Sequence, residues 1–289
     1  MKLPAFIELL KPITWFPPMW AFACGAISSG EPFSENWKVV LLGVILTGPL
    51  VCASSQAVND WFDRHVDALN EPNRPIPSGR IPGRWGLYLG IIWSLLSLIV
   101  SSFLGTWGFF ATLLALVFSW AYSMPPIRLK QNGWYGNLAC SISYEGLAWI
   151  TGAALLSATF TPSKSSLLFA GLYSVGAHGI MTLNDFKAIE GDKKMGVRSL
   201  PVQLGADLAA KVACLIMLVP QVMVCIYLYS IDQTWNSLAI LILIFFQMGL
   251  MKYFIDKPID RALFYSGFGV PLFVSGMMIA AFGIRHLEA

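Results

Sequence analysis

The sequence predicts an all-α integral membrane protein that forms a single domain over residues 1–289. Hydrophobic residues make up 56% of the chain, charged residues only 12%, and the mean hydropathy is +0.64, which excludes an ordinary soluble globular protein. The apolar runs have the length of membrane-crossing helices and lack the short alternation of an outer-membrane barrel. We therefore expect a bundle of transmembrane helices around a central cavity.

Nine apolar stretches are long enough to cross a bilayer as helices. Their approximate ranges are 12–30, 37–59, 86–104, 107–123, 135–157, 165–184, 207–229, 236–254 and 262–283. The uncharged run between Arg84 and Arg128 is divided at Gly105. Because the first stretch begins near Pro12, we expect no cleavable signal or transit peptide before it, which favours a bacterial inner-membrane protein.

A first acidic motif, NDWFDRHVD, covers residues 59–67 and ends the second stretch. If the helix continues, spacings of three and four place Asp60, Asp63 and Asp67 on one face, with the outer two roughly 10 Å apart. Like charges on one face need a compensating cation, and hard carboxylate oxygens favour Mg²⁺ together with substrate phosphate. The alternative interpretation is an acidic helix end that is merely solvated.

A second acidic motif, NDFKAIEGD, covers residues 184–192 and also follows an uncharged run. It supplies Asp185, Glu190 and Asp192. With Glu71, just after the first motif, seven of the 16 acidic residues of the chain lie at these two helix ends. Two such clusters predict one shared metal and phosphate site.

Positively charged residues predict the orientation of the bundle. With nine crossings and a cytoplasmic N-terminus, 16 of the 19 lysines and arginines lie in the cytoplasm, and only Lys38, Lys164 and Arg285 lie on the other side. Both acidic motifs then face the cytoplasm, after the second and sixth spans. This placement also suggests two four-helix halves in parallel orientation, followed by a ninth helix.

Basic residues lie close to both motifs. A stiff, proline-rich loop carries Arg74 and Arg80, the following loop carries Arg128 and Lys130 after Tyr122, and Lys187 and Lys193 interleave with the second acidic motif. Such cations can hold diphosphate oxygens and stabilise the charge that builds as diphosphate leaves. The alternatives are ordinary ion pairs and connecting loops without a catalytic role.

Two ionisable residues are expected inside the membrane. Glu145 lies in the fifth predicted span, and His178 lies in the sixth, two turns before Asp185. An ionisable group within a membrane is costly, which favours a functional role, although an interhelical hydrogen bond would also satisfy either side chain.

Three longer strings carry a resemblance to a known family. NDWFDRHVDALNEPNRPIPSGRIP, YSMPPIRLKQNGW and NDFKAIEGDKKMGVRSLPVQLG are similar to segments of the intramembrane (UbiA) prenyltransferase superfamily, and more narrowly of the chlorophyll and bacteriochlorophyll synthases. The resemblance covers nearly the whole chain. One departure is Ala188, which replaces the first acid of the DxxxD pattern found in much of the superfamily, so the metal ligand of this loop stays open among Asp185, Glu190 and Asp192.

The resemblance implies transfer of a geranylgeranyl or phytyl group from its diphosphate to the propionate of bacteriochlorophyllide a, with Mg²⁺ as cofactor. The implied metal ligands are Asn59, Asp60, Asp63 and Asp67, together with acids of the second motif. The implied diphosphate-binding residues are Arg74, Arg80, Arg128, Lys130, Lys187 and Lys193. Catalytic roles are implied for Asp60, Asp63, Asp67, Lys130 and Tyr122, and pigment binding for Glu145 and His178. A propionate is already ionised near pH 7, so no general base is required.

Other functions remain open at this point. The acceptor can instead be chlorophyllide, a quinone precursor or haem, and a secondary transporter also combines many spans with an intramembrane acid. The resemblance places the protein in the cytoplasmic or intracytoplasmic photosynthetic membrane and suggests pigment-assembly proteins as partners. No nucleic-acid partner is expected.

Overall fold

The computed structural model describes residues 3–157 and 159–287, and these residues form helices joined by short loops, as predicted. Lys2, one of the sixteen residues assigned to the cytoplasmic side, lies outside the described residues. The first part of the chain forms α1 (Leu3–Leu10), α2 (Phe16–Ser28), α3 (Phe33–Ile45), α4 (Ala53–Asn70), α5 (Trp85–Ser101) and α6 (Gly105–Ser123). The second part forms α7 (Gly133–Ser141), α8 (Ala148–Leu156), α9 (Lys164–Asp185), α10 (Ile189–Met195), α11 (Leu200–Leu204), α12 (Ala206–Ser230), α13 (Thr234–Asp256) and α14 (Pro258–Ile284).

Short helical segments join several of these helices. Single 3₁₀ turns lie at Pro12–Thr14, Leu129–Gln131 and Arg285–Leu287. Two π-helical segments, Leu46–Cys52 and Ile142–Leu147, join α3 to α4 and α7 to α8. The segment Leu46–Cys52 contains Pro49, which cannot donate a backbone hydrogen bond. The indole Nε1 of Trp93 donates to the carbonyl oxygen of Pro49 at 3.0 Å.

Six helical stretches of the described chain are long and apolar enough to cross a membrane. They are Phe33–Asn70, Gly105–Ser123, Lys164–Asp185, Ala206–Ser230, Thr234–Asp256 and Pro258–Ile284. The predicted count of nine spans is not confirmed. The other three predicted spans fall on α2 with 13 residues, on α5 with 17 residues, and on α7 and α8, which the π-helical segment Ile142–Leu147 separates.

The ends of the helices follow from local sequence. Prolines occupy the first turn of α2 and begin α14, where a missing backbone N–H costs no helical hydrogen bond. Asn132 caps α7 by accepting from the backbone nitrogen of Trp134, and Ser163 caps α9 by accepting from that of Ser166, each at 3.0 Å.

The crossing of α2 and α8 is the closest helix contact near the centre of the bundle. A Cβ atom on Gly25 would lie 2.0 Å from the carbonyl oxygen of Trp149, and one on Gly152 would lie 2.2 Å from that of Phe22. Only glycine allows the two backbones to approach this closely, as small residues do at helix crossings in membranes.

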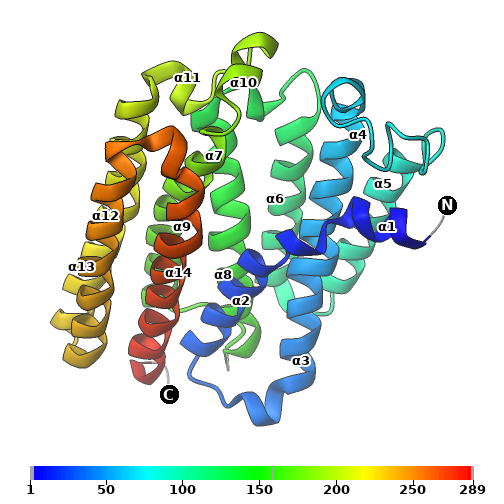
Figure 1. The fold of residues 1–289 in the computed structure, drawn as a ribbon. Coiled ribbons are helices and arrows are strands. Elements are labelled where there is room, and N and C mark those ends of the chain that lie inside the picture. Colours follow the sequence, from blue (N-terminus) through cyan, green and yellow to red (C-terminus); the bar gives the residue numbers. More distant parts are fainter. Residues whose placement is uncertain (1–2, 158, 288–289) are drawn as a thin grey trace.

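Helices α9, α12, α13 and α14 pack into a solid group on one side of the bundle (Figure 1). A buried polar chain runs through this group. Gln221 donates to Gln247, and Gln247 donates to the hydroxyl of Tyr265, each at 2.9 Å. Polar partners of this kind fix the register of helices that apolar packing alone would hold loosely.

The two acidic motifs lie at the same end of the bundle. Figure 1 shows the C-terminal end of α4 at this end together with α10 and α11, whereas α3 begins at the opposite end, near the C-terminus. The loops at the acidic end are joined through their backbones, because Gly133 N donates to Arg198 O at 2.8 Å and Arg198 N donates to Gln131 O at 2.9 Å. The loops after α6 and α9 therefore form one continuous surface.

Candidate active site

The first acidic motif lies on the uninterrupted helix α4, and its outer two carboxylates share one arginine. Nη1 of Arg74 lies 3.4 Å from Oδ1 of Asp60 and 3.0 Å from Oδ2 of Asp67. Both aspartates are buried. They face the same way, as the spacing of seven residues predicts for a helix. Arg74 also pairs with Glu71, which orients its guanidinium.

Asp63 lies between these residues on α4 and binds a different pair of cations. Its Oδ1 accepts from Nη2 of Arg128 at 3.1 Å, and its Oδ2 accepts from the ammonium of Lys130. Arg128 adopts a left-handed backbone conformation with φ 37°. The loop after α6 thus delivers two cations to one carboxylate, and Lys130 also lies 5.9 Å from the ring centroid of Tyr122.

Lys11 is a site residue that the sequence analysis missed. Its Nζ lies 2.6 Å from Oδ1 of Asp60. It reaches this position because α1 folds back onto α4, with Ala5 and Leu9 packed in one apolar cluster with Ala57. Lys11 itself takes a left-handed conformation with φ 45°. Its place in the sequence, one residue before the first predicted span, is the only signal that could have indicated this role.

At Arg74 and Lys130, two cations outside the predicted spans, burial and neighbouring carboxylates shift the pKa in opposite directions. Burial lowers the pKa of Lys130, and the nearby Asp63 carboxylate offsets part of that shift. Burial would also lower the pKa of Arg74, but the carboxylates of Asp60 and Asp67 outweigh it, so its pKa is raised. The pKa of Arg74 is thus shifted upward and that of Lys130 downward.

The second acidic motif is divided by the end of α9. Asp185 is the last residue of that helix, and its Oδ2 accepts from Nδ2 of Asn137 at 3.2 Å. Glu190 and Asp192 lie on the short helix α10, where the Glu190 side chain is 82% exposed and 3.6 Å from Nζ of Lys193. Asp192 is partly buried, and burial raises its pKa. Lys187 is exposed. Of this motif, Asp185 is the acid that turns toward neighbouring helices.

Two predicted diphosphate or metal residues have other partners. Arg80 binds Glu8 through both terminal nitrogens, at 2.6 and 2.9 Å, and so ties its loop to α1. Asn59 donates to the hydroxyl of Ser123 on α6 at 3.1 Å. Arg80 is thus engaged away from the carboxylates of α4, while Asn59 remains beside them.

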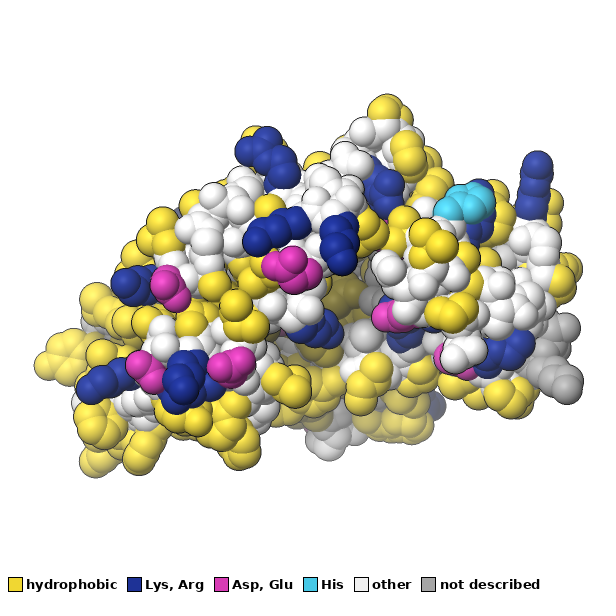
Figure 2. Space-filling view, turned by 45° about the horizontal axis from the view of Figure 1, so that its top comes forward, with side chains coloured by type: hydrophobic (Ala, Val, Ile, Leu, Met, Phe, Trp, Pro, Cys, Tyr) yellow, Lys and Arg dark blue, Asp and Glu magenta, His cyan; other side chains and the backbone are white. Residues whose placement is uncertain are grey.

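The carboxylates are spread out rather than gathered. Within residues 3–157 and 159–287, no group of three or more His, Cys, Asp or Glu side chains is placed to hold a metal ion. The donor chemistry still fits Mg²⁺, because α4 presents hard carboxylate oxygens and Oδ2 of Asp60 is buried without a hydrogen-bond partner in the described part of the chain. Figure 2 shows basic and acidic side chains gathered over this end of the molecule, around a hollow.

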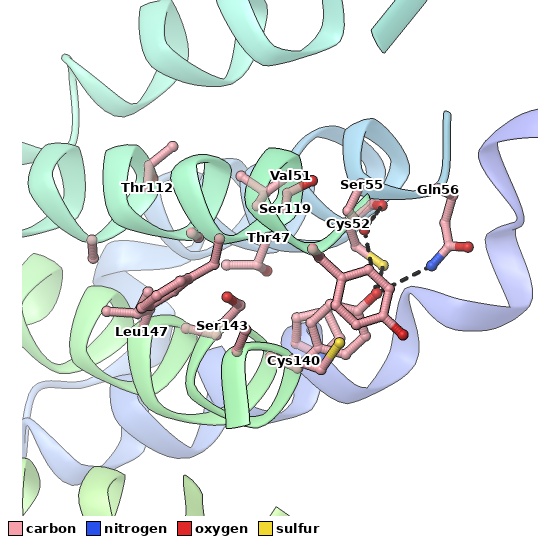
Figure 3. A pocket seen from close by; sticks show the side chains of 18 of the residues that line it. Thr47, Val51, Cys52, Ser55, Gln56, Thr112, Ser119, Cys140, Ser143 and Leu147 are labelled. Atoms are coloured by element: carbon pink, nitrogen blue, oxygen red, sulfur yellow. Dashed lines mark hydrogen bonds between the residues drawn. The ribbon is translucent and has the colours of Figure 1, made fainter. Parts of the chain in front are cut away.

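A cavity begins beside this charged end and runs down between three helical segments. We call it the reaction cavity. One wall is α4 with the π-helical segment before it, the second is α6, and the third is α7 and α8 with the π-helical segment between them (Figure 3). Its upper lining includes Asn59, Gln56, Tyr122 and Tyr144, and its lower lining combines the apolar Ala111, Ala115, Leu147 and Ala148 with the hydroxyl-bearing Thr47, Thr112 and Thr151.

The hydroxyl of Tyr144 is held in the cavity wall by several neighbours. Gln56 donates to it at 3.1 Å, and Ser55 lies 3.3 Å and Cys52 3.5 Å away (Figure 3). The π-helical turn that carries Tyr144 is thereby fixed against α4. Sequence analysis did not identify Tyr144, because no charge or motif marks it.

Glu145 and His178 are buried but do not line the reaction cavity. The carboxylate of Glu145 has one buried oxygen, Oε2, without a hydrogen-bond partner in the described chain. His178 Nε2 lies 3.2 Å from the carbonyl oxygen of Trp134, and the two rings are 5.6 Å apart. Their role in pigment binding remains a prediction.

The comparison with known protein families decides between an enzyme and a transporter. Residues 14–281 match the model of the UbiA prenyltransferase family. The chain belongs to this family. The resemblance derived from the sequence is confirmed, and membership decides for an enzyme that transfers prenyl groups over a transporter.

Relatives within the family differ in how similar they are. The chain is 56% identical to the "Bacteriochlorophyll synthase 33 kDa chain" of Rhodobacter capsulatus, over 97% of this chain and 93% of that protein. It is 36% identical to the chloroplastic chlorophyll synthase of Oryza sativa subsp. japonica, over 97% of this chain and 76% of that protein. Among solved structures, a UbiA homologue from Archaeoglobus fulgidus bound to DMAPP and Mg²⁺ matches 98% of this chain and 99% of its own, with 18% identity and a TM-score of 0.65. That likeness shows the fold of this multi-span membrane protein.

Proposed function

We propose that this UbiA-family enzyme is a bacteriochlorophyll synthase that transfers a C20 prenyl group, geranylgeranyl or phytyl, from its diphosphate to the propionate of bacteriochlorophyllide a. The observation that carries the proposal is the reaction cavity itself, which is lined by uncharged side chains and has four cations next to its upper end. The named relative at 56% identity supports the choice of acceptor over chlorophyllide.

The donor diphosphate is placed by the cations around α4. Four cations each form an ion pair with an aspartate of this helix: Lys11, Arg74, Arg128 and Lys130. With Glu71, which also pairs with Arg74, four cations face four carboxylates, so a bound divalent cation would give the site the positive charge that suits a diphosphate. Their N–H groups, which donate to these aspartates, would stabilise the negative charge that develops on the diphosphate as the carbon–oxygen bond breaks.

A divalent cation would complete this site. The residues that would hold it are Asp60, Asp63 and Asp67, with Asn59 beside them and Asp185 as the candidate from the second motif. Bound there, Mg²⁺ would neutralise the leaving diphosphate. Support for the metal comes from the donor chemistry and from the Mg²⁺-bound Archaeoglobus homologue.

The acceptor needs no base from the protein. A propionate is ionised near pH 7, so one of its oxygens can form the new bond to carbon 1 of the prenyl group while the bond from carbon 1 to the diphosphate oxygen breaks. The chain's task is to hold the two reactants together and to keep water from the allylic cation, which the mostly apolar lower walls of the cavity do.

We also propose that the charged end faces the cytoplasm and that the bundle crosses the membrane nine times, with the shorter helices α2 and α5 and the interrupted pair α7 and α8 completing the count. A reporter that is active only in the periplasm should be inactive when fused after Arg80. When fused after Glu288, which lies outside the described residues, it should be active. Periplasmic activity at the first position would overturn both the orientation and the count.

The function is tested with purified protein in lipid nanodiscs. Geranylgeranyl diphosphate and Mg²⁺ are combined with bacteriochlorophyllide a, with chlorophyllide a or with a quinone precursor, and esterified product is measured by chromatography. We expect kcat/KM to be highest with bacteriochlorophyllide. Higher kcat/KM with chlorophyllide would change the acceptor, and diphosphate release without any prenylated pigment would refute the proposal.

A further inference from the structure

One face of α6 lines the reaction cavity along its full depth. The lining residues on this helix are Ala111, Thr112, Ala115, Phe118, Ser119 and Tyr122. Tyr122 marks the upper end, since it lies next to Lys130. At a rise of about 1.5 Å per residue, Ala115 lies roughly 10 Å below Tyr122 and Ala111 roughly 16 Å below it. Alanine at both depths leaves the space in front of α6 open.

The depth of this face can be compared with the length of a prenyl chain. An extended chain of single bonds advances about 3.3–3.6 Å for every three bonds, or about 1.2 Å per bond. The main chains of C10, C15 and C20 prenyl groups contain eight, twelve and sixteen carbons, so their lengths are roughly 8, 13 and 18 Å by the same measure. The distance from Tyr122 to Ala111 therefore suits a C20 chain with its first carbon near the diphosphate site.

The lower end of the reaction cavity lies where α6 packs against α8. One turn below Ala111, a Cβ atom on Gly108 would lie 3.6 Å from Cγ2 of Thr151 and 3.3 Å from Cβ of Leu104. Leu104 and Thr151 are buried. A chain that passes Ala111 thus meets packed side chains.

We infer that Ala111 and Ala115 determine which prenyl chain lengths the enzyme uses, and that a C20 chain is the longest that fits above the contact between α6 and α8. This inference rests on the proposed function, because it assigns the reaction cavity to the prenyl donor. A larger side chain at position 115 shortens the cavity to the length of a C10 chain, whereas one at position 111 removes only its last part.

The test measures kcat/KM for C10, C15, C20 and C25 prenyl diphosphates with bacteriochlorophyllide as acceptor. In Ala115→Phe, the C20-to-C10 and C15-to-C10 ratios should each fall by about tenfold or more, the scale at which a wall discriminates against extra methylenes. In Ala111→Phe, only the C20-to-C10 ratio should fall. The matched control is Val117→Phe, since Val117 is 53% exposed on the same helix and does not line the cavity.

The wild-type enzyme supplies a second measurement that does not depend on a variant being folded. Its C25-to-C20 ratio should lie below about one tenth, because the contact of α6 with α8 stops the longer chain. Unchanged ratios in Ala115→Phe, an equal fall in Val117→Phe, or ready use of C25 by the wild type would overturn the inference while leaving the proposed function intact. Absence of prenyl transfer from every donor would instead refute the proposed function, and the inference with it.

Discussion

The two acidic motifs begin with the same dipeptide, Asn-Asp, at the ends of apolar helices, but they have different structures. Helix α4 continues for ten residues beyond Asp60, to Asn70, and holds Asp60, Asp63 and Asp67 on one rigid rod. Helix α9 ends at Asp185, and the remaining acids lie on the separate helix α10. The first motif is enclosed by cations from three other segments, whereas Glu190 of the second is open to solvent and pairs with Lys193 of its own helix.

This difference shows that continuation of the helix, rather than the number of carboxylates, decides what an acidic motif can do. On a continuous helix, charges three and four residues apart stay aligned and must be neutralised together. When the helix ends, each acid takes its own direction. We therefore expect the first motif to carry most of the catalytic effect, and the following predictions test that expectation from the largest effect to the smallest.

Asp63→Asn should have the largest effect. It removes the charge to which both Arg128 and Lys130 are bound, between the other two acids, so kcat/KM should fall by at least about 10²-fold, the scale at which single groups stabilise developing charge. The control is Asp256→Asn, which breaks the ion pair with Arg261 on a different loop. Immunoblots of membranes establish equal amounts of protein, and near-normal turnover of Asp63→Asn would contradict the assignment.

Arg74→Gln and Arg80→Gln form a matched pair within one loop. Arg74 contacts two aspartates of α4, so its loss should lower kcat/KM by about 10- to 10²-fold, whereas loss of Arg80, which binds Glu8 at the surface, should cost less than about threefold. Steady-state kinetics at several donor concentrations measures both. Equal losses in the two variants would show that Arg80 leaves Glu8 when the donor binds.

Asp185→Asn and Glu190→Gln compare acids within the second motif. The first should lower activity by about tenfold and raise the Mg²⁺ concentration needed for half-maximal rate, as outer ligands of a metal site do. The second removes an exposed charge paired at 3.6 Å and should change activity by less than about twofold. A larger effect at Glu190 would mean that α10 moves onto the site during turnover.

Lys130→Arg should change the pH dependence more than the rate at neutral pH. Burial lowers the pKa of Lys130, so its charge is present below that pKa and is lost as the pH rises through it. In the wild type, kcat/KM for the donor should fall at a lower pH than an ordinary lysine would give. Arginine keeps its charge, so this fall should move to higher pH in the variant. An unchanged alkaline limb would show that another group titrates there.

Sequence reasoning identified the features that depend on helical periodicity. The shared face of Asp60 and Asp67 and the approach of Arg74 follow from spacing on one helix and from the adjoining loop. The role of Lys11 could not be derived in this way, because it depends on α1 folding back onto α4 and on a left-handed residue at position 11. The partner of Arg80 was also not predictable, because Glu8 is distant in sequence.

The structure does not confirm three of the nine predicted spans, and one of the three carries an interruption that the sequence does not reveal. Hydropathy counts apolar residues but does not detect where a helix becomes π-helical, as between α7 and α8. Tyr144 was missed in the same region. Its neighbours Gln56 and Ser55 are nearly ninety residues away in the chain, and an uncharged wall residue carries no signal in a single sequence.

The π-helical segment Leu46–Cys52 also constrains how this gene can change in length. Each residue added to or removed from a helix turns everything beyond it by about 100°, and a π turn is equivalent to one inserted residue. Deleting one residue between positions 46 and 52 would restore a regular α-helix but would rotate Asp60 away from Lys11, which precedes the deletion in the chain. A one-codon deletion should therefore abolish activity here, whereas the exposed turn at residues 159–161, between α8 and α9, should tolerate one.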